Sequence, residues 1–375
     1  MGRPLNGAAS NGAPLTVGVI GTGVISGQYF AQFPKLSNLR LAAVADLDAD
    51  RAALAAAEHG TRALTVDELL ADPGIDAVLN LTIPAAHAEI GLRALAAGKH
   101  LYGEKPLALT TAEARPMLDA AAAAGLRIGC APDTVLGTGI QTARAVLDAG
   151  RIGDPVGASV HWSNAGHESW HPAPAFYFQP GGGPLFDMGP YYLTSLVTLF
   201  GPVLRVSGAV SRSGRERTIA TGPNAGAAVP VEVDTHVTAL LEHAGGVIST
   251  VTVSFEVWAT RSPQFEVYGT GGTIAVPDPN RFSDAVAVAT AAEPEFSEVP
   301  VAAGYPDAGR GVGLSDLARA IETGRPHRAS GELAFHVLDV MESIIRAGHE
   351  HAVIELGSTV ERPAPVALGA DPAGW

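Results

Sequence analysis

Hydrophobic and polar positions alternate in two different ways along this chain of 375 residues. In the first part, short apolar runs alternate with longer segments whose apolar residues recur at helical spacing. Short continuous apolar runs are typical of strands buried on both faces, and their alternation with helices predicts a parallel sheet covered on both sides. The predicted strands are 15–20, 39–45, 75–81, 100–102 and 127–130, and the predicted helices run from a glycine turn to about residue 32 and over 49–58, 85–97 and 111–124.

After about residue 132 the pattern changes. A helix over 139–149 precedes a strand over 156–162, an aromatic and proline-rich loop, and a helix over 190–199. Several segments then alternate apolar and polar residues between glycine turns, which is typical of antiparallel strands. These strands are 203–211, 233–242, 247–256, 264–269 and 273–276, and two late helices are 314–322 and 332–347.

The fold class predicted from this pattern is α/β plus α+β, with a doubly wound parallel sheet followed by an open, mainly antiparallel sheet. Residues 1–14 have no periodicity and are predicted to be a disordered lead-in. The first domain is predicted over 15–133 and the second over 134–362, with helix 332–347 as a candidate to pack back on the first domain. Residues 363–375 are predicted to be a proline-rich tail.

Composition narrows the function classes. Hydrophobic residues make up 47% of the chain and charged residues 17%, which suffices for two cores. The net charge of −14 and the lack of a basic block argue against nucleic acid and anionic membranes as partners. The lone cysteine, Cys130, excludes an intrachain disulfide and is expected to be a buried apolar residue. No window approaches 18 apolar residues and no secretion signal is visible, so we expect a soluble, cytoplasmic protein. We expect no metal site.

The first predicted strand leads directly into a glycine-rich turn that starts a helix, Gly21-Thr22-Gly23-Val24-Ile25-Ser26. In dinucleotide-binding folds, the first glycine allows the tight turn, the second lets the backbone approach a pyrophosphate, and the third small residue lets helix and strand pack closely. Asp46 ends the second strand, where an acid accepts ribose hydroxyls and repels a 2′-phosphate. The first domain is therefore predicted to be a Rossmann domain that binds NAD rather than NADP. The alternative for Asp46 is a simple turn residue.

The third predicted strand ends close to a second candidate part of the cofactor site. Thr82 and Pro84 follow its carboxyl end, where ligands bind in open α/β sheets. His87 comes soon after them. Two interpretations of His87 stay open: contact with the cofactor, or stabilisation of the first turn of helix 85–97.

Lys105 is the candidate catalytic residue of the first domain. The chain has only three lysines and uses arginine for its other basic residues. A lysine amine can be tuned into an acid or base, whereas arginine stays charged. Pro106 keeps Lys105 out of helical geometry, so the amine lies on a non-helical corner just after a strand. An ordinary surface lysine is the alternative.

The motifs occur in an order that resembles one enzyme family. They are the glycine turn, Thr82-x-Pro84-x-x-His87, Glu104-Lys105-Pro106, and the run 181–189 with the sequence Gly-Gly-Gly-Pro-Leu-Phe-Asp-Met-Gly. Together they resemble the glucose–fructose oxidoreductase / inositol dehydrogenase / rhizopine-catabolism (Gfo/Idh/MocA) family over roughly residues 17–345. The resemblance implies that Glu104 and Lys105 lie at the nicotinamide. It also implies that Lys105 handles the proton of the reacting hydroxyl, and that Asp187 assists from the second domain.

One position departs from the family pattern. The family commonly has Asp-x-Gly-x-His, whereas this chain has Tyr191 where the histidine is expected. A tyrosine can still form hydrogen bonds and relay a proton, although its ordinary pKa is about 10 rather than about 6.5. Tyr191 is therefore included with Lys105 and Asp187 as a catalytic candidate.

The loop over 161–178 is rich in histidine and aromatic residues. Its segment 167–171, His-Glu-Ser-Trp-His, matches the spacing of a zinc-protease helix, but flanking glycine and prolines disfavour the helix that such a site requires. We expect a substrate loop instead, in which aromatic faces cover a sugar ring and polar groups bind its hydroxyls; ordinary packing of the aromatics is the alternative. The substrate-binding candidates are His167, Trp170, His171, Tyr177, Asp187 and Tyr191.

Three functions follow as hypotheses. The first is an NAD-dependent oxidoreductase of a sugar, polyol or glycoside hydroxyl, with Lys105 as proton acceptor. The second uses the same residues in a glycosidase that oxidises a ring hydroxyl transiently, eliminates the aglycone, and returns water and hydride with recycled cofactor. The third is a regulator that binds NAD without turnover, which predicts a degraded catalytic set. An exposed sheet face in the second domain predicts a homodimer or homotetramer.

Overall fold

The computed structural model describes residues 12–374, so residues 1–11 of the predicted lead-in lie outside the described part of the chain. The described residues form two compact units. The first contains residues up to 137 together with 305–335 and 366–374, and the second contains 138–304 and 336–365. The predicted single boundary after residue 133 stays a prediction. The units differ from it because the chain returns to the first unit after residue 304, where Leu314 and Leu317 join its core.

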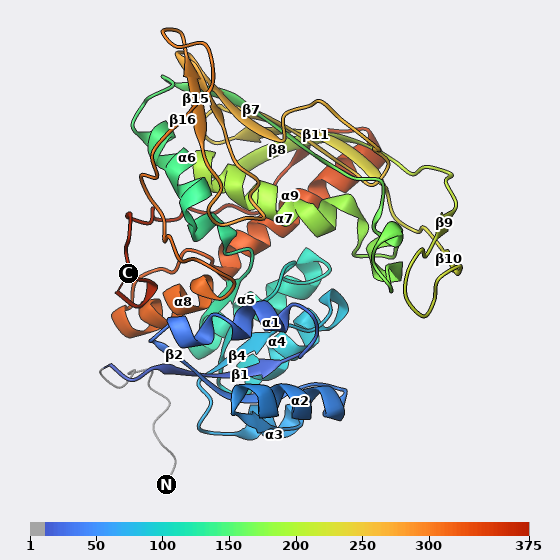
Figure 1. Ribbon diagram of the computed structural model, residues 1–375, viewed down its shortest axis with the longest axis vertical. Coiled ribbons are helices and arrows are strands. Elements are labelled where there is room, and N and C mark those ends of the chain that lie inside the picture. The colour runs from blue at the N-terminus through green and yellow to red at the C-terminus, as the bar shows by residue number, and fades with distance from the viewer. Residues whose placement is uncertain (1–11, 375) are drawn as a thin grey trace. The chain divides into compact units, whose positions relative to one another are not determined.

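The first unit contains a six-stranded sheet in which every pair of neighbouring strands is parallel (Figure 1). The strand order is β3-β2-β1-β4-β5-β6, which confirms the predicted doubly wound sheet. The strands are β1 Leu15–Ile20, β2 Leu39–Ala45, β3 Arg62–Ala63, β4 Ala77–Asn80, β5 His100–Gly103 and β6 Ile128–Cys130.

Helices cover both faces of this sheet because successive strand residues point to opposite sides. Val17 and Val19 of β1 share a core with Tyr29 of α1 and Leu317 of α8. Gly18, between them, faces the α3 side, where an added Cβ would lie 2.8 Å from the Leu69 side chain. The helices of this unit are α1 Ser26–Phe30, α2 Ala49–His59, α3 Val66–Ala71, α4 His87–Ala96, α5 Thr111–Ala124 and α8 Val312–Thr323, with short 3-10 turns at η1 Phe33–Lys35, η2 Pro84–Ala86, η3 Thr134–Leu136 and η6 Pro372–Gly374.

The second unit is built on a mixed, mainly antiparallel sheet of nine strands, which confirms the predicted open, mainly antiparallel sheet. Its order is β16-β15-β14-β13-β7-β12-β11-β8-β17, and the pair β7–β12 is parallel. The strands are β7 Pro155–Ser163, β8 Val203–Ser211, β11 His236–His243, β12 Ile248–Ser254, β13 Phe265–Gly269, β14 Gly272–Ala275, β15 Ala287–Thr290, β16 Ser297–Glu298 and β17 Ile354–Glu355; a separate pair is β9 Arg217–Thr218 with β10 Ala228–Val229.

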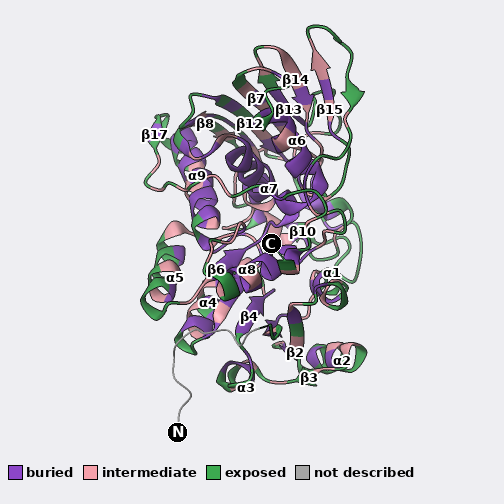
Figure 2. Ribbon diagram, turned by 90° about the vertical axis from the view of Figure 1, so that its left-hand side faces the viewer, coloured by how far each residue is buried: buried purple, intermediate pink, exposed green. Residues whose placement is uncertain are grey.

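One face of the nine-stranded sheet is covered by helices. Helix α7, Gly183–Phe200, packs against β11 and β12, and Figure 2 shows it buried along most of its length. Helix α6, Thr138–Asp148, lies beside α7. Helix α9, Gly331–Glu350, starts in the first unit and continues into the second, where Ile344 contacts Gly208 of β8. The opposite face of β11 and β12 carries the exposed side chains of the strand alternation.

Several helix boundaries differ from the prediction, and the difference is largest at the start of α7. Helix α7 begins at Gly183 rather than at residue 190, because Pro184 occupies its first turn and Pro190 is accommodated inside the helix. Helix α1 ends at Phe30, and a short turn that contains Pro34 follows it.

The carboxyl-terminal segment packs against the first unit. Val366 and Pro372 are buried, and η6 contacts α8. Among residues 12–374, no helix combines the length and the apolar character that crossing a membrane requires.

Candidate functional site

The glycine turn has the geometry that its motif predicts. It joins β1 to α1, and Gly21 has φ of +99°, a conformation that favours glycine. A Cβ at Gly21 would lie 2.6 Å from the Leu81 carbonyl oxygen, whereas a Cβ at Gly23 would meet no protein atom within 4 Å. Ser26 is buried and donates from Oγ to the Gly23 carbonyl oxygen at 2.7 Å. The turn is therefore tight at Gly21 and open to a ligand at Gly23.

Asp46 at the end of β2 is held against this turn. Its Oδ2 accepts hydrogen bonds from the backbone N–H and the hydroxyl of Thr22, at 2.7 and 3.0 Å. Its Oδ1 accepts from Asp48 N and from the Arg51 guanidinium, at 2.9 Å each. Burial acts to raise the pKa of Asp46, but the hydrogen bonds from Thr22 and Asp48 outweigh it and lower the pKa. The carboxylate is thus ionised and oriented beside the turn, where the sequence analysis placed a ribose acceptor.

The carboxyl end of β4 is organised by Asn80, which the sequence analysis did not single out. Asn80 Oδ1 accepts from the hydroxyl of Thr82 at 2.7 Å and from its N–H at 3.2 Å, and its amide nitrogen donates to the His87 carbonyl oxygen. A buried polar residue at the end of an apolar strand is the sequence signal that could have identified it.

His87 is a buried brace between two chain segments. Its Nδ1 lies 2.6 Å from the Pro106 carbonyl oxygen and its Nε2 lies 3.0 Å from the Thr82 carbonyl oxygen. Burial lowers its pKa, although both carbonyls favour the charged ring. With 2% of its surface exposed, the ring connects the end of β4 to the Lys105–Pro106 corner. The ring therefore has a structural role that differs from stabilising the first turn of the helix, and its contact with the cofactor stays a prediction.

The corner that carries Lys105 is tied to helix α1. Glu104 N–H donates to the Asn80 carbonyl oxygen at 3.0 Å. The Glu104 side chain, 8% exposed, accepts from the Tyr29 hydroxyl at 2.7 Å on Oε1 and from Lys105 N at 3.0 Å on Oε2. One carboxylate oxygen of Glu104 thus fixes the backbone of Lys105, and the other ties this corner to Tyr29 of α1.

A buried polar network lies next to this corner. Asp133, 0% exposed, accepts from the N–H groups of Gly311 and Gly313 at the start of α8, at 2.8 and 3.1 Å. Burial raises its pKa, with Arg310 and these hydrogen bonds opposing the shift. Cys130 is buried as expected, and burial raises the pKa of its thiol.

In the second unit, Asp187 on α7 pairs with His167 from the aromatic loop. His167 Nε2 lies 2.9 Å from Asp187 Oδ2, and both side chains are largely buried. On its other side, His167 Nδ1 lies 3.2 Å from the amide nitrogen of Asn164. Tyr191 follows Asp187 by one helical turn on α7 and is buried.

Aromatic rings surround His167. Their centroids lie 4.2 Å away for Tyr177, 4.7 Å for Phe255 and 5.1 Å for Trp170. His171 stacks edgewise on Trp170 and Tyr177, and burial lowers its pKa. The structure thus brings the predicted substrate candidates of the loop together with Asp187.

Glu168 has a structural role in this loop. Its Oε1 accepts from Arg215 and Arg217, each at 2.8 Å, and the Arg217 side chain is fully buried. Arg217 also pairs with Glu256 and lies over the Phe178 ring. Residues 167–169 form a 3-10 turn rather than the helix that the zinc-protease motif requires. Among residues 12–374, no group of three or more His, Cys, Asp and Glu residues could hold a metal ion.

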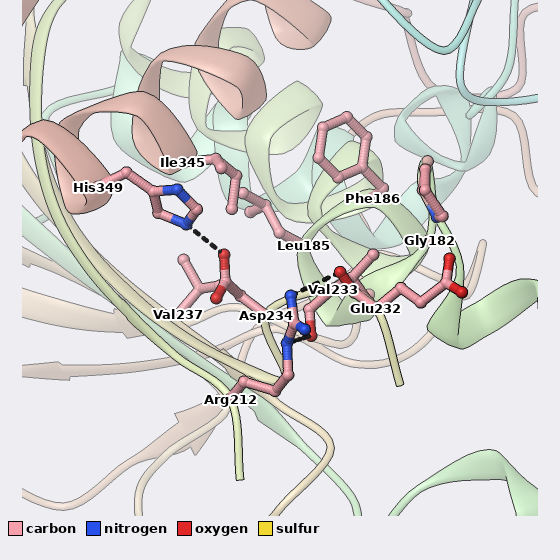
Figure 3. A pocket seen from close by; sticks show the side chains of 13 residues that line it. Gly182, Leu185, Phe186, Arg212, Glu232, Val233, Asp234, Val237, Ile345 and His349 are labelled. Atoms are coloured by element: carbon pink, nitrogen blue, oxygen red, sulfur yellow. Dashed lines mark hydrogen bonds and ion pairs between the residues drawn. The ribbon is translucent and has the colours of Figure 1, made fainter. Parts of the chain in front are cut away.

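A separate cavity of about 250 Å³ lies at the start of α7 (Figure 3). Figure 3 shows Arg212, Glu232 and the ion pair of Asp234 with His349 around it. Arg212 is occupied by the backbone carbonyl oxygens of residues 231–233. The predicted substrate candidates are not among the residues that line this cavity.

Family models match both units. The model of the oxidoreductase family with an NAD-binding Rossmann fold matches residues 15–131, and the model of the Gfo/Idh/MocA C-terminal domain matches residues 140–275. A Rossmann domain joined to such a second domain defines a class of two-domain oxidoreductases. This chain belongs to the Gfo/Idh/MocA family, as its motifs predicted.

Individual relatives agree with this assignment. The chain is 34% identical over 145 residues to 1,5-anhydro-D-fructose reductase of Ensifer adhaerens, which covers 38% of this chain and 44% of the relative. It is 37% identical over 145 residues to inositol 2-dehydrogenase of Gluconacetobacter diazotrophicus, which covers 37% of this chain and 43% of the relative. The chain therefore matches less than half the length of these relatives.

Solved structures share the fold over most of the chain. A levoglucosan dehydrogenase in complex with NADH and L-sorbose has a TM-score of 0.78 at 24% identity and covers 92% of this chain and 100% of that one. An NAD-binding oxidoreductase from Klebsiella pneumoniae has a TM-score of 0.80 at 22% identity, covering 92% and 99%. At these identities the likeness establishes the fold.

Proposed function

We propose that this protein is an NAD-dependent oxidoreductase that acts on a hydroxyl of a sugar, polyol or glycoside. The observation that carries the proposal is the hydrogen-bonded link between the Lys105 corner and helix α1, which follows the glycine turn. Glu104 fixes the backbone of Lys105 and accepts from Tyr29 of α1, the helix that follows the glycine turn. A titratable amine and a dinucleotide turn thus belong to one set of hydrogen-bonded elements.

The residues of the first unit fit NAD. The open space at Gly23 suits a pyrophosphate, with Val24 and Ile25 continuing the turn toward the helix. The ionised Asp46, held by Thr22, suits ribose hydroxyls and disfavours a 2′-phosphate. Contacts from Thr82, Pro84, His87 and Glu104 to the cofactor remain predictions.

The proposed chemistry divides between proton and hydride. NAD, when bound, accepts the hydride from the carbon that bears the hydroxyl. Lys105, with its amine neutral, takes the hydroxyl proton, so that a carbonyl product remains. Asp187 accepts a hydrogen bond from the substrate and keeps it oriented, and Tyr191 remains a candidate for proton relay. Trp170, His171 and Tyr177 are proposed to contact the sugar ring.

The named activities of the relatives support this substrate class. Inositol, 1,5-anhydrofructose and levoglucosan are all polyhydroxylated rings, and these names belong to proteins that resemble part of this chain in sequence or share its fold. They define a panel for the test. The purified protein is mixed with NAD and inositol, levoglucosan, free sugars or aryl glycosides, or with NADH and 1,5-anhydrofructose.

The panel experiment separates the proposal from its alternatives. We expect NADH formation with one of the hydroxyl compounds, or NADH oxidation with 1,5-anhydrofructose. NAD-dependent release of an aglycone without net NADH would instead establish a redox-neutral glycosidase, for which the His167–Asp187 pair beside Tyr191 supplies additional proton-handling groups. NAD binding without turnover of any compound would favour a regulator.

We also propose that two copies associate through the outer face of the nine-stranded sheet. Leu240 of β11 and Ile248 of β12 are 48% and 51% exposed on that face, and Tyr268 of β13 lies on it as well. Such an apolar strip favours association. Light scattering should give a mass that is a multiple of the chain mass of 38.3 kDa. The double variant Leu240→Lys with Ile248→Lys should lower this measured mass.

A further inference from the structure

The orientation of one side-chain amide determines the hydrogen-bonding state of His167. Asn164 Oδ1 accepts from the Gly166 N–H at 2.8 Å, so the amide oxygen faces the turn. The amide nitrogen therefore faces His167, whose Nδ1 lies 3.2 Å away. An amide nitrogen is only a donor, so Nδ1 must be the acceptor of this hydrogen bond.

The proton of the neutral His167 ring is then on Nε2. That nitrogen lies 2.9 Å from Asp187 Oδ2, so it donates to the carboxylate. The three side chains form a directed chain in which Asn164 donates to His167 and His167 donates to Asp187. A proton on Nδ1 would face the N–H atoms of the amide, so this geometry selects one tautomer.

The surroundings hold this chain in place. The backbone of Asn164 is tied to the end of β12, because its N–H donates to the Ser254 carbonyl oxygen and its own carbonyl accepts from Val257 N, both at 3.0 Å. His167 is 5% exposed and enclosed by Tyr177 and Phe255. The next residue, Glu168, is anchored by two arginines. The imidazole ring therefore has little room to rotate.

We propose that His167 is a positioning residue for Asp187, with Asn164 setting its tautomer. The inference rests on the proposed function. Asp187 lies on α7, where Tyr191 follows it by one helical turn. His167 supplies an imidazole beside the same carboxylate from a different element. Its N–H donates to Oδ2 and thereby holds the Asp187 carboxylate in one orientation.

Nuclear magnetic resonance of the full chain labelled with ¹⁵N-histidine tests the tautomer without a substrate. The His167 signals are those lost in His167→Gln. We expect wild-type His167 at neutral pH to be protonated on Nε2 and unprotonated on Nδ1. Asn164→Asp places an acceptor opposite Nδ1 and should move a proton there. Protonation of Nδ1 in the wild type, or averaging between tautomers as for an exposed histidine, would contradict the inference.

Kinetics on the panel compound with the highest wild-type rate tests the positioning role. His167→Gln retains an N–H donor and should keep kcat within about threefold of wild type. His167→Leu removes it and should lower kcat by about 10- to 100-fold, the loss expected for one charge-assisted hydrogen bond, with unchanged affinity for NAD. His351→Asn, at an exposed position, is the matched control.

Two kinetic outcomes would overturn the role: equal losses in His167→Gln and His167→Leu, or no loss in His167→Leu. Failure of the proposed function is distinguishable from both. If the wild type turns over no panel compound, the proposed function fails and the positioning role fails with it. The hydrogen-bond chain itself is still decided by the spectrum.

Discussion

The two units hold their candidate chemical groups in different ways. In the first unit, Asp46 and Lys105 follow the ends of parallel strands. Thr22 of the glycine turn, 24 residues before Asp46, orients Asp46, and the adjacent residue Glu104 holds the backbone of Lys105. In the second unit, Asp187 lies on a long helix, and its partner His167 comes from a loop without regular strands. That loop is held by Arg215 and Arg217, 47 to 50 residues further along the chain.

The two units differ in how far the positions of their candidate groups depend on individual side chains. Strand ends of a parallel sheet fix positions through the backbone, so the first unit can present the same groups with few side-chain constraints. A loop held by buried ion pairs depends on individual side chains. We therefore expect variants in the two units to fail differently.

The largest expected effect is on catalysis in the first unit. Lys105→Met should lower kcat by about 10³-fold, because it removes the proposed general base while Glu104 still holds the corner. NAD affinity, measured by titration, should be unchanged. The matched control is Lys35→Met at an exposed position, which should behave as wild type. A loss below tenfold would remove Lys105 from the mechanism.

In the second unit, the largest expected effect is on stability. Arg217→Met should lower the free energy of unfolding by about 3 kcal/mol, because it leaves the buried carboxylate of Glu168 and the partly buried one of Glu256 with less compensation. Urea denaturation followed by tryptophan fluorescence measures it, since Trp162, Trp170 and Trp258 all lie in this unit.

Arg205→Met is the control for that prediction. Arg205 pairs with Glu242 in the same unit, but both side chains are about half exposed, so the change should stay within about 0.5 kcal/mol. Equal effects of the two variants would show that the ion pairs around the loop do not hold it.

Acid should weaken the second unit through buried histidines. Burial lowers the pKa of His243 and of His336 to about 4. Below the ordinary value of about 6.5 the unfolded chain binds protons that the folded chain does not, so stability falls as pH drops from 6.5 toward 4. Between pH 7.5 and 5, His336→Asn should reduce this pH-dependent loss by about 2 kcal/mol relative to wild type. His351→Asn should leave the urea-derived pH dependence unchanged; an unchanged dependence in His336→Asn would contradict the assignment.

The smallest expected effect concerns the choice of cofactor. Asp46→Ser should shift the ratio of NADP to NAD affinity by about tenfold toward NADP, because it removes a carboxylate that repels a 2′-phosphate and frees Arg51 from its ion pair. Fluorescence titration with both nucleotides measures the ratio. Asp50→Ser, exposed on α2, is the control and should leave the ratio unchanged.

The sequence predicted the first unit more completely than the second. The strands β1 and β2 and the helix α5 have the predicted bounds, because apolar runs and capping residues mark them locally. The position of the glycine turn between β1 and α1, and that of Asp46 after β2, were predicted from spacing together with the strand and helix around them. Asn80 and Tyr29 were missed, because their roles depend on hydrogen bonds to His87 and Glu104 that no short motif encodes.

In the second unit, the residues of the loop were identified but their partners were not. The composition of residues 161–178 predicted a chemical role, yet Arg217 and Phe255 contact this loop from distant segments. Asn164 was also missed, although the sequence Asn-Ala-Gly over 164–166 is a typical side-chain turn signal. The start of α7 was predicted too late because Pro190 was interpreted as the first turn of the helix.

Transfer of deuterium is the most direct test of the central claim. The protein is incubated with NAD and with carbon-deuterated inositol or levoglucosan, and the nicotinamide is analysed by mass spectrometry. The account predicts deuterated NADH with wild-type protein and its loss in Lys105→Met. NADH without deuterium, or no NADH with either compound while NAD is bound, would contradict hydride transfer from these ring carbons.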